Sequence, residues 1–154
     1  MITLKQILVP TDFSENSEVA AKYARALAQA FQADLHLMHV LEDPFASTFD
    51  PVSFVPPLNF YEEIEAQTRI RLTRQLADWE PLQPHVEIVA SRGSAFVEII
   101  RYAKDHGIDL IVLGTHGRGP IAHMLMGSVA ERIVRKAPCP VLTVRHPQHE
   151  FVMP

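Results

Sequence analysis

The stretch LIVLGTHGRGP, from Leu110 to Pro120, decides the fold, because an apolar run of strand length passes directly into a glycine-rich turn. After residues 121–126, Gly127-Ser128-Val129 opens a helical stretch that ends ahead of Pro138. A strand, a turn and a helix in succession form the repeating unit of parallel α/β sheets. The same succession recurs along the chain.

Short apolar runs, each bounded by Pro, Gly or acidic residues, predict five strands. We expect them at Gln6 to Val9, Leu35 to Leu41, Val86 to Ala90, Leu110 to Leu113 and Val141 to Val144. Amphipathic helical patterns separate these runs. Strands that alternate with helices select parallel pairing through right-handed crossovers, so we expect a single-domain α/β protein with an open sheet and helices on both faces.

The first helical pattern carries Val19, Tyr23, Leu27 and Phe31 at intervals of four, with Ala20, Ala24 and Ala28 beside them on the same expected buried face. Ser14 or Asp12 could cap it. The other patterns carry Phe60, Ile64, Leu72, Leu76 and Trp79; Phe96, Ile100 and Ala103 ahead of a C-cap glycine, Gly107; and Ser128 to Lys136. In sheets of this class, ligands bind beyond the carboxyl ends of the strands, where the strand order reverses.

Composition limits the function classes. The chain has 154 residues, of which 47% are hydrophobic, as expected for one globular domain. Its 14 Lys and Arg against 18 Asp and Glu give a net charge of -4, which argues against nucleic acid as a partner. No stretch has the length of a signal-peptide core or a membrane span, so we expect a cytoplasmic protein without a membrane partner. The single cysteine, Cys139, is expected to be buried and structural.

The turn after Leu113 has three properties that suit phosphate. Glycines allow close backbone approach and positive φ, a helix start offers unpaired N–H groups, and the Ser128 hydroxyl adds a donor. A Walker A loop is excluded because no lysine precedes Ser128. The segment from Gly117 to Ala122 matches Gly-x-Gly-x-x-Ala but follows the fourth strand rather than the first. Spacing alone equally allows a long connection in which the glycines permit turns and Ser128 is an N-cap.

The combined pattern resembles a known family. The spacing Gly114-x2-Gly117-x9-Gly127-Ser128, preceded by Asp109 and an apolar strand and followed by Pro-Cys-Pro-Val-Leu, is similar to the ATP-binding branch of the universal stress protein family. The run from Ile7 to Ser14, ILVPTDFS, and the run from Leu37 to Val40, LMHV, also resemble that family. The resemblance extends from Lys5 to Arg145 and implies a Rossmann-like sheet of order 3-2-1-4-5, as in adenine nucleotide alpha hydrolases.

The resemblance also implies roles for individual residues. Asp12 would bind the ribose hydroxyls, Val40 would present its backbone to the adenine edge, and Pro10 and Thr11 would shape the base pocket. The triphosphate would lie against the turn and the helix start, at Gly114, Thr115, Gly117, Arg118, Gly127, Ser128 and Val129. The implied ligand is ATP, with AMP and ADP as alternatives, and Mg²⁺ could be held by the phosphates and Ser128.

Other interpretations of these residues remain open. Asp12 could form a capping box with Glu15, and a valine at a strand end such as Val40 is usually core. Arg118 could contact phosphate or lie in solvent. The histidines show no metal-ligand spacing, so we expect no protein metal centre at His36, His39, His85, His106, His116 or His123.

We expect a homodimeric ATP-binding regulatory module that spans residues 1–146, with a tail at 147–154. No catalytic residue is predicted, because no acid–base pair accompanies the phosphate turn. A slow ATPase or nucleotidyl-transferring enzyme that uses His116 or Asp12 is the first alternative, and a nucleotide-free dimerisation module is the second. The edge strand Val141 to Val144 would join the two copies. The Pro- and Phe-rich connection at 42–58 is either a surface excursion or a lid.

Overall fold

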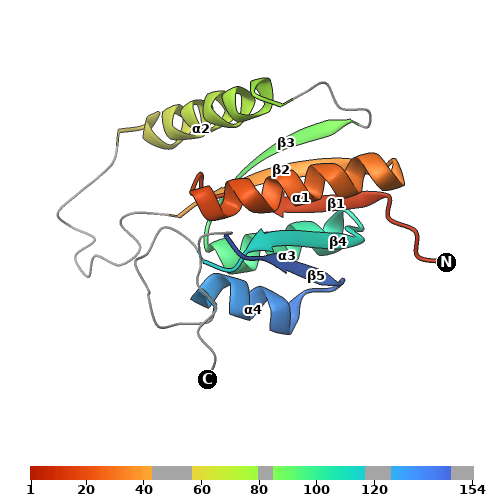
Figure 1. The fold of residues 1–154 in the computed structure, drawn as a ribbon. Helices are drawn as coiled ribbons and strands as arrows, with labels where there is room; N and C mark the ends of the chain where they lie inside the picture. Colours follow the sequence, from red (N-terminus) through yellow and green to blue (C-terminus); the bar gives the residue numbers. More distant parts are fainter. Residues whose placement is uncertain (43–56, 80–84, 117–125, 147–154) are drawn as a thin grey trace.

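The computed structural model describes residues 1–42, 57–79, 85–116 and 126–146. Its sheet has five parallel strands in the order β3-β2-β1-β4-β5, as expected (Figure 1). The tail after residue 146 and most of the 42–58 connection lie outside the described residues. The strands are β1 (Gln6–Pro10), β2 (Asp34–Leu41), β3 (Val86–Arg92), β4 (Leu110–Gly114) and β5 (Val141–Val144).

In the described residues four helices cover the sheet: α1 (Glu15–Phe31), α2 (Phe60–Ala77), α3 (Ala95–Asp105) and α4 (Ser128–Lys136). Side chains alternate between the faces of a strand, so each face builds its own core. Ile7 and Val9 of β1 pack with residues of α1 and α2, whereas Leu8 between them packs with residues of α3 and α4. The predicted helices on both faces are therefore confirmed, with α1 and α2 on one face and α3 and α4 on the other (Figure 1).

The buried stripe of α1 differs from the predicted one. Four of its alanines are buried together with Ser17, and Val19 and Leu27 of the predicted row are partly buried against the same core, but Tyr23 is 55% exposed and Phe31 is 42% exposed. Residues at intervals of four drift around a helix of 3.6 residues per turn, so the predicted row does not stay on one face. The row of small side chains lies against the sheet and allows close approach; its members are Ala20, Ala24 and Ala28, with Ala21 beside them.

Strand β1 lies where the strand order reverses. It pairs with β2 along its whole length, from Gln6–Asp34 to Pro10–Met38, whereas its pairing with β4 consists of Ile7–Leu110 and Leu8–Ile111. Asp109 ties the amino ends of these two strands together, because its carboxylate accepts N–H groups of Lys5 at 2.7 Å and Gln6 at 3.0 Å. The two strands are thus fastened at their amino ends and unpaired toward their carboxyl ends.

Two further expectations concern the end of the chain and the membrane. Cys139 is half-buried rather than buried, and it packs at the margin of the α3–α4 core, where burial raises the pKa of its thiol. Its place between Pro138 and Pro140, just ahead of edge strand β5, leaves one side open.

Among the described residues, no helix is long and apolar enough to cross a membrane.

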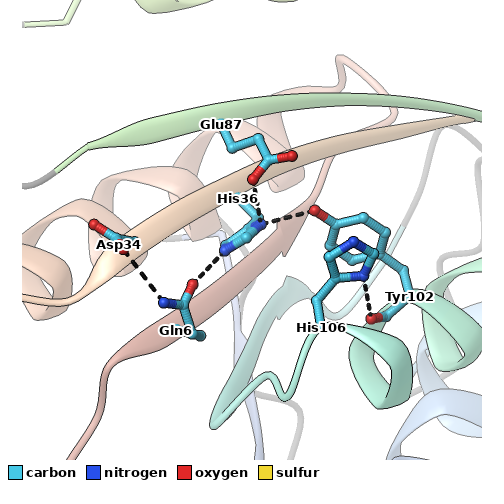
Figure 2. A network of polar contacts seen from close by, with 6 residues as sticks. All are labelled: Gln6, Asp34, His36, Glu87, Tyr102 and His106. Carbon is cyan, nitrogen blue, oxygen red and sulfur yellow. Dashed lines mark hydrogen bonds and ion pairs between the residues drawn. The ribbon is translucent and has the colours of Figure 1, made fainter.

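A polar network fastens α3 to the sheet around the buried His36 of β2 (Figure 2). The amide of Gln6 donates to Asp34 at 3.3 Å, which directs the Gln6 oxygen toward His36 Nε2. Nε2 therefore carries the proton, and Nδ1 accepts from the Tyr102 hydroxyl at 2.8 Å. Every polar atom of this imidazole is paired while the ring is neutral.

Protonation of His36 has a defined cost. Burial lowers the pKa of His36; the carboxylates of Glu87, at 3.5 Å, and of Asp34 oppose this effect, and the nearby His106 and His85 add to it. The unfolded chain, with an ordinary histidine pKa near 6.5, takes up the proton more readily. The contribution to stability is therefore complete above that value and is lost as the pH falls toward the folded pKa.

We predict that His36→Gln, which can still donate to Gln6 and accept from Tyr102, removes this component of the pH dependence. Between pH 7 and pH 5 the wild-type protein should lose about 1 kcal/mol more unfolding free energy than the variant, as measured by urea unfolding at each pH. The exposed His85→Gln serves as the comparison and should differ from wild type much less than His36→Gln does, because His85 makes the smallest of these contributions to the pKa of His36. Equal pH profiles for wild type and His36→Gln would contradict the assignment.

Candidate functional site

A cavity of about 580 Å³ lies beyond the carboxyl ends of β1, β2 and β4. This volume is within the range of small-molecule sites, and its position at the strand reversal is the one expected for the fold. Eight of the predicted site residues line it: Pro10, Thr11, Asp12, Val40, Gly114, Gly127, Ser128 and Val129. The structure therefore brings together residues that are more than a hundred positions apart in the sequence.

Asp12 lies on one side of the cavity, in the turn between β1 and α1. Its carboxylate accepts hydrogen bonds from the N–H of Ser14, at 3.0 Å, and from the Ser14 hydroxyl. The helix cap is Ser14, whose hydroxyl accepts the N–H of Ser17 at 3.3 Å, so the capping box of Asp12 with Glu15 is not formed. Asp12 is half-buried and borders the cavity, where its carboxylate can accept further donors.

The charge state of Asp12 follows from two opposing effects. Burial raises the pKa of its carboxyl, but hydrogen bonds from Ser14 and Ser17 stabilise the ionised form and lower it by more. The net pKa lies below the ordinary value of 3.8. Asp12 is therefore an anion throughout the neutral range, and a ligand that meets it must offer donors rather than negative charge.

A directed chain of hydrogen bonds fixes the turn that carries Asp12. The Phe13 N–H donates to the Thr11 hydroxyl at 3.0 Å, which donates to the Ser17 hydroxyl at 3.1 Å, which donates to the Ser14 carbonyl at 2.8 Å. Thr11 and Ser17 are both buried, so these bonds are protected from water. His39 adds a bond from the next strand, because its Nδ1–H donates to the Thr11 carbonyl at 2.7 Å.

Helix α4 lies on the opposite side of the cavity. Gly127 is its N-cap and Ser128 its first residue, so the interpretation of Ser128 as an N-cap is wrong. The Gly127 N–H donates to the Thr115 carbonyl at 2.6 Å, and the first intrahelical bond runs from Glu131 N–H to Gly127. The N–H groups of Ser128, Val129 and Ala130 precede that bond, and all three residues line the cavity. They form a donor set suited to an anion.

Two residues of the turn after β4 have structural partners. Thr115 is buried and is not among the residues that line the cavity; its N–H donates to Val144 at 3.1 Å, and its hydroxyl contacts His116 at 3.0 Å. Gly114 does border the cavity, but a β-carbon there would lie 2.9 Å from the Asn16 carbonyl oxygen of α1. The absence of a side chain at Gly114 is therefore required by helix packing.

Some residues singled out in the sequence lie outside the described part of the chain, and some residues that line the cavity were not predicted. Gly117, Arg118 and His123 lie outside the described residues. Sequence reasoning missed part of the lining, which comes from strand ends and from inward positions of α1, α3 and α4: Ser17, Met38, Glu42, Ala95, Ile99, Ala130 and Ile133. His39 and His116, considered only as metal ligands or catalytic groups, also line it. Within 1–42, 57–79, 85–116 and 126–146, no three His, Cys, Asp or Glu side chains form a metal cluster.

Fold and cavity together define a Rossmann-like α/β protein with a cavity at its strand reversal, where proteins of this fold class bind ligands. The model of the universal stress protein family matches residues 3–145, and the chain belongs to this family.

Relatives support the assignment along the whole chain. Universal stress protein MJ0531 of Methanocaldococcus jannaschii is 34% identical, over 95% of this chain and 85% of the relative. Universal stress protein MJ0577 of the same organism is 32% identical, over 94% of this chain and 96% of the relative. Among solved structures, that of MJ0577 has a TM-score of 0.78 and 27% identity, over 96% of this chain and 99% of the other. The universal stress protein UspA of Lactobacillus plantarum has a TM-score of 0.71 and 27% identity, over 94% and 100%.

We predict that Gly114→Ala destabilises the fold by about 1–3 kcal/mol, because the added methyl group meets the backbone of Asn16 rather than a movable side chain. Urea unfolding measures the loss. Gly107→Asn is the control: Gly107 has φ of 59° and nothing within 4 Å of a β-carbon, and asparagine tolerates that φ. A Gly114→Ala protein as stable as wild type would show that α1 is not held by this contact.

Proposed function

We propose that this chain is an ATP-binding universal stress protein that acts as a nucleotide-dependent regulatory module. The observation that carries the proposal is the cavity itself, with an ionised carboxylate on one side and the N-terminus of α4 on the other. A nucleotide has complementary ends, because its ribose offers hydroxyl donors and its phosphates are anions. These ends match Asp12 and α4 respectively.

The order of strands supports one orientation of the nucleotide in this proposal. The adenine lies at the end of β2, where Val40 is 9% exposed and offers its backbone, and where Met38 and Ile99 add apolar walls. The ribose lies at Asp12, at the end of β1. The phosphates lie at the turn after β4 and at α4, where Ser128, Val129 and Ala130 present their N–H groups. Gly117 and Arg118, on the same turn, complete the phosphate site in this proposal.

A universal stress protein of the same fold, 24% identical and with a TM-score of 0.61, forms a complex with cAMP. This fold therefore holds an adenine nucleotide in at least one protein. We favour ATP over AMP or ADP because α4 begins with three N–H donors, those of Ser128, Val129 and Ala130, which can bind more than one phosphate. Mg²⁺ fits as a companion of the phosphates, because it retains several waters and needs few protein oxygens beyond the Ser128 hydroxyl.

The regulatory part of the proposal rests on the chemistry of the lining. Asp12 has a lowered pKa and is held by Ser14, which suits an acceptor of hydrogen bonds better than a general base. A partner protein would then distinguish the nucleotide-bound protein from the nucleotide-free protein. We propose that the active species is a cytoplasmic homodimer joined through β5, the edge strand, whose Leu142 is 37% exposed.

We predict that Asp12→Asn weakens ATP binding about tenfold or more, because a charge-assisted hydrogen bond to the ribose is replaced by a neutral one. Gly127→Leu should abolish binding by filling the cavity, and it should not unfold the chain, because Gly127 has φ of -66°, which leucine adopts freely. Isothermal titration calorimetry with ATP measures both effects. Asp105→Asn, at the exposed end of α3, is the matched control. If both cavity variants bind ATP as wild type does, the site is elsewhere.

An enzyme on the same scaffold is the second candidate, and His116 at the cavity wall is the observation in its favour. Release of inorganic phosphate from ATP by the purified chain separates the candidates. The regulatory module predicts no sustained release. Sustained release that Ser128→Ala abolishes would overturn it in favour of the ATPase.

A further inference from the structure

Phe13 adopts a backbone conformation that is unfavourable for its residue type. Its φ is 62°, in the left-handed region. In the described part of the chain one other non-glycine residue has a positive φ, Gln32, which is the C-cap of α1, where this conformation is common. Phe13 lies instead between Asp12 and the cap Ser14, beside the cavity. Strain of this kind persists only where surrounding contacts impose it.

The contacts that impose it come from two other elements. The guanidinium of Arg71, on α2, lies 3.9 Å from the centre of the Phe13 ring. On β2, the ring of His39 lies 4.6 Å from it, tilted by 42°. His39 in turn donates to the Thr11 carbonyl, two residues before Phe13. The Phe13 ring therefore contacts one side chain of α2 and one of β2, and we refer to Arg71, Phe13 and His39 as the Phe13 cluster.

The Phe13 cluster and the strained backbone bear on the same carboxylate, that of Asp12. The N–H of Ser14, the residue after Phe13, donates to the Asp12 carboxylate at 3.0 Å. This N–H lies beyond the N–Cα bond of Phe13, so its approach to Asp12 depends on the φ of Phe13. The N–H of Phe13 itself donates to the Thr11 hydroxyl at 3.0 Å and anchors the start of the same turn.

We infer that Phe13 is a positioning residue: the contacts of its ring with Arg71 and His39 hold the turn in the strained form that aims the Asp12 carboxylate at the ribose of a bound nucleotide. This inference rests on the proposed function and adds to it a residue that touches neither base nor phosphate. It also makes α2 part of the site, through Arg71, although among the described residues no part of α2 lines the cavity.

The test compares ATP with 2′-deoxy-ATP, because loss of one ribose hydroxyl reports on Asp12 alone. Wild type should prefer ATP by about tenfold. Phe13→Ala, which removes the ring, should lower ATP affinity about tenfold and 2′-deoxy-ATP affinity little, so that the preference disappears. Phe13→Gly, whose backbone adopts φ of 62° freely, should lose the preference as well, because the ring rather than the backbone holds the turn. Phe13→Tyr, which keeps the ring, should retain it.

A second readout needs no nucleotide. The hydrogen bonds from Ser14 lower the pKa of Asp12 below its ordinary value, and NMR of the full chain should detect this shift in wild type. In Phe13→Ala the pKa should return toward the ordinary value. Arg71→Met, a surface change that leaves folding intact, should raise it in the same direction by a smaller amount. Arg69→Met is the matched control, since Arg69 pairs with Glu65 at 3.2 Å on the same helix.

The outcomes separate the inference from the function it rests on. If wild type binds neither nucleotide, the proposed function fails, and the Asp12 pKa in Phe13→Ala alone decides whether Phe13 positions the turn. If wild type binds ATP and Phe13→Ala keeps both the preference and the lowered pKa, the inference is overturned. An equal loss of ATP and 2′-deoxy-ATP with an unchanged pKa also overturns it, because Phe13 would then act on general stability.

Discussion

The site depends on the way β1 is shared between two neighbours. It pairs with β2 as far as Pro10, but with β4 at Ile7 and Leu8 only. Asp109 clamps the amino ends of β1 and β4, so the strands separate toward their carboxyl ends. The chain leaves β1 toward α1 on one face of the sheet, and α4 lies on the other face. The cavity is therefore a direct result of the strand order.

Close packing of α1 against the sheet determines the shape of the cavity on the side of Asp12. The alanine row of α1 and the missing side chain of Gly114 allow the helix to approach the sheet until Asn16 contacts the end of β4. That approach places the turn before α1 at the cavity wall, and buried hydroxyl groups lock it there. The same residues thus stabilise the fold and orient the Asp12 carboxylate. Substitutions on the buried face of α1 are therefore expected to change ligand binding.

The sequence alone allowed the sheet, its five strands and eight residues of the cavity lining to be predicted, because parallel α/β units have short apolar runs and their ligands lie at known strand ends. Asp12 was expected at the end of β1, and it borders the cavity there. The buried face of α1, the packing role of Gly114 and the strain at Phe13 could not be predicted. Each depends on how closely one element approaches another, as when Arg71 and His39 meet Phe13 from α2 and β2. Periodicity identifies a helix but does not give the distance between two helices.

The central claim is that the cavity between Asp12 and α4 binds an adenine nucleotide in one orientation. Backbone amide NMR of the full chain, titrated with ATP, tests it most directly, because each end of the nucleotide reports on its own amides. The account predicts the largest shifts at Asp12 and Phe13, at Val40, and at Ser128 to Ala130, with GTP far less effective. Saturating ATP that leaves these amides unchanged, or shifts only amides on the exposed faces of the helices, would contradict it.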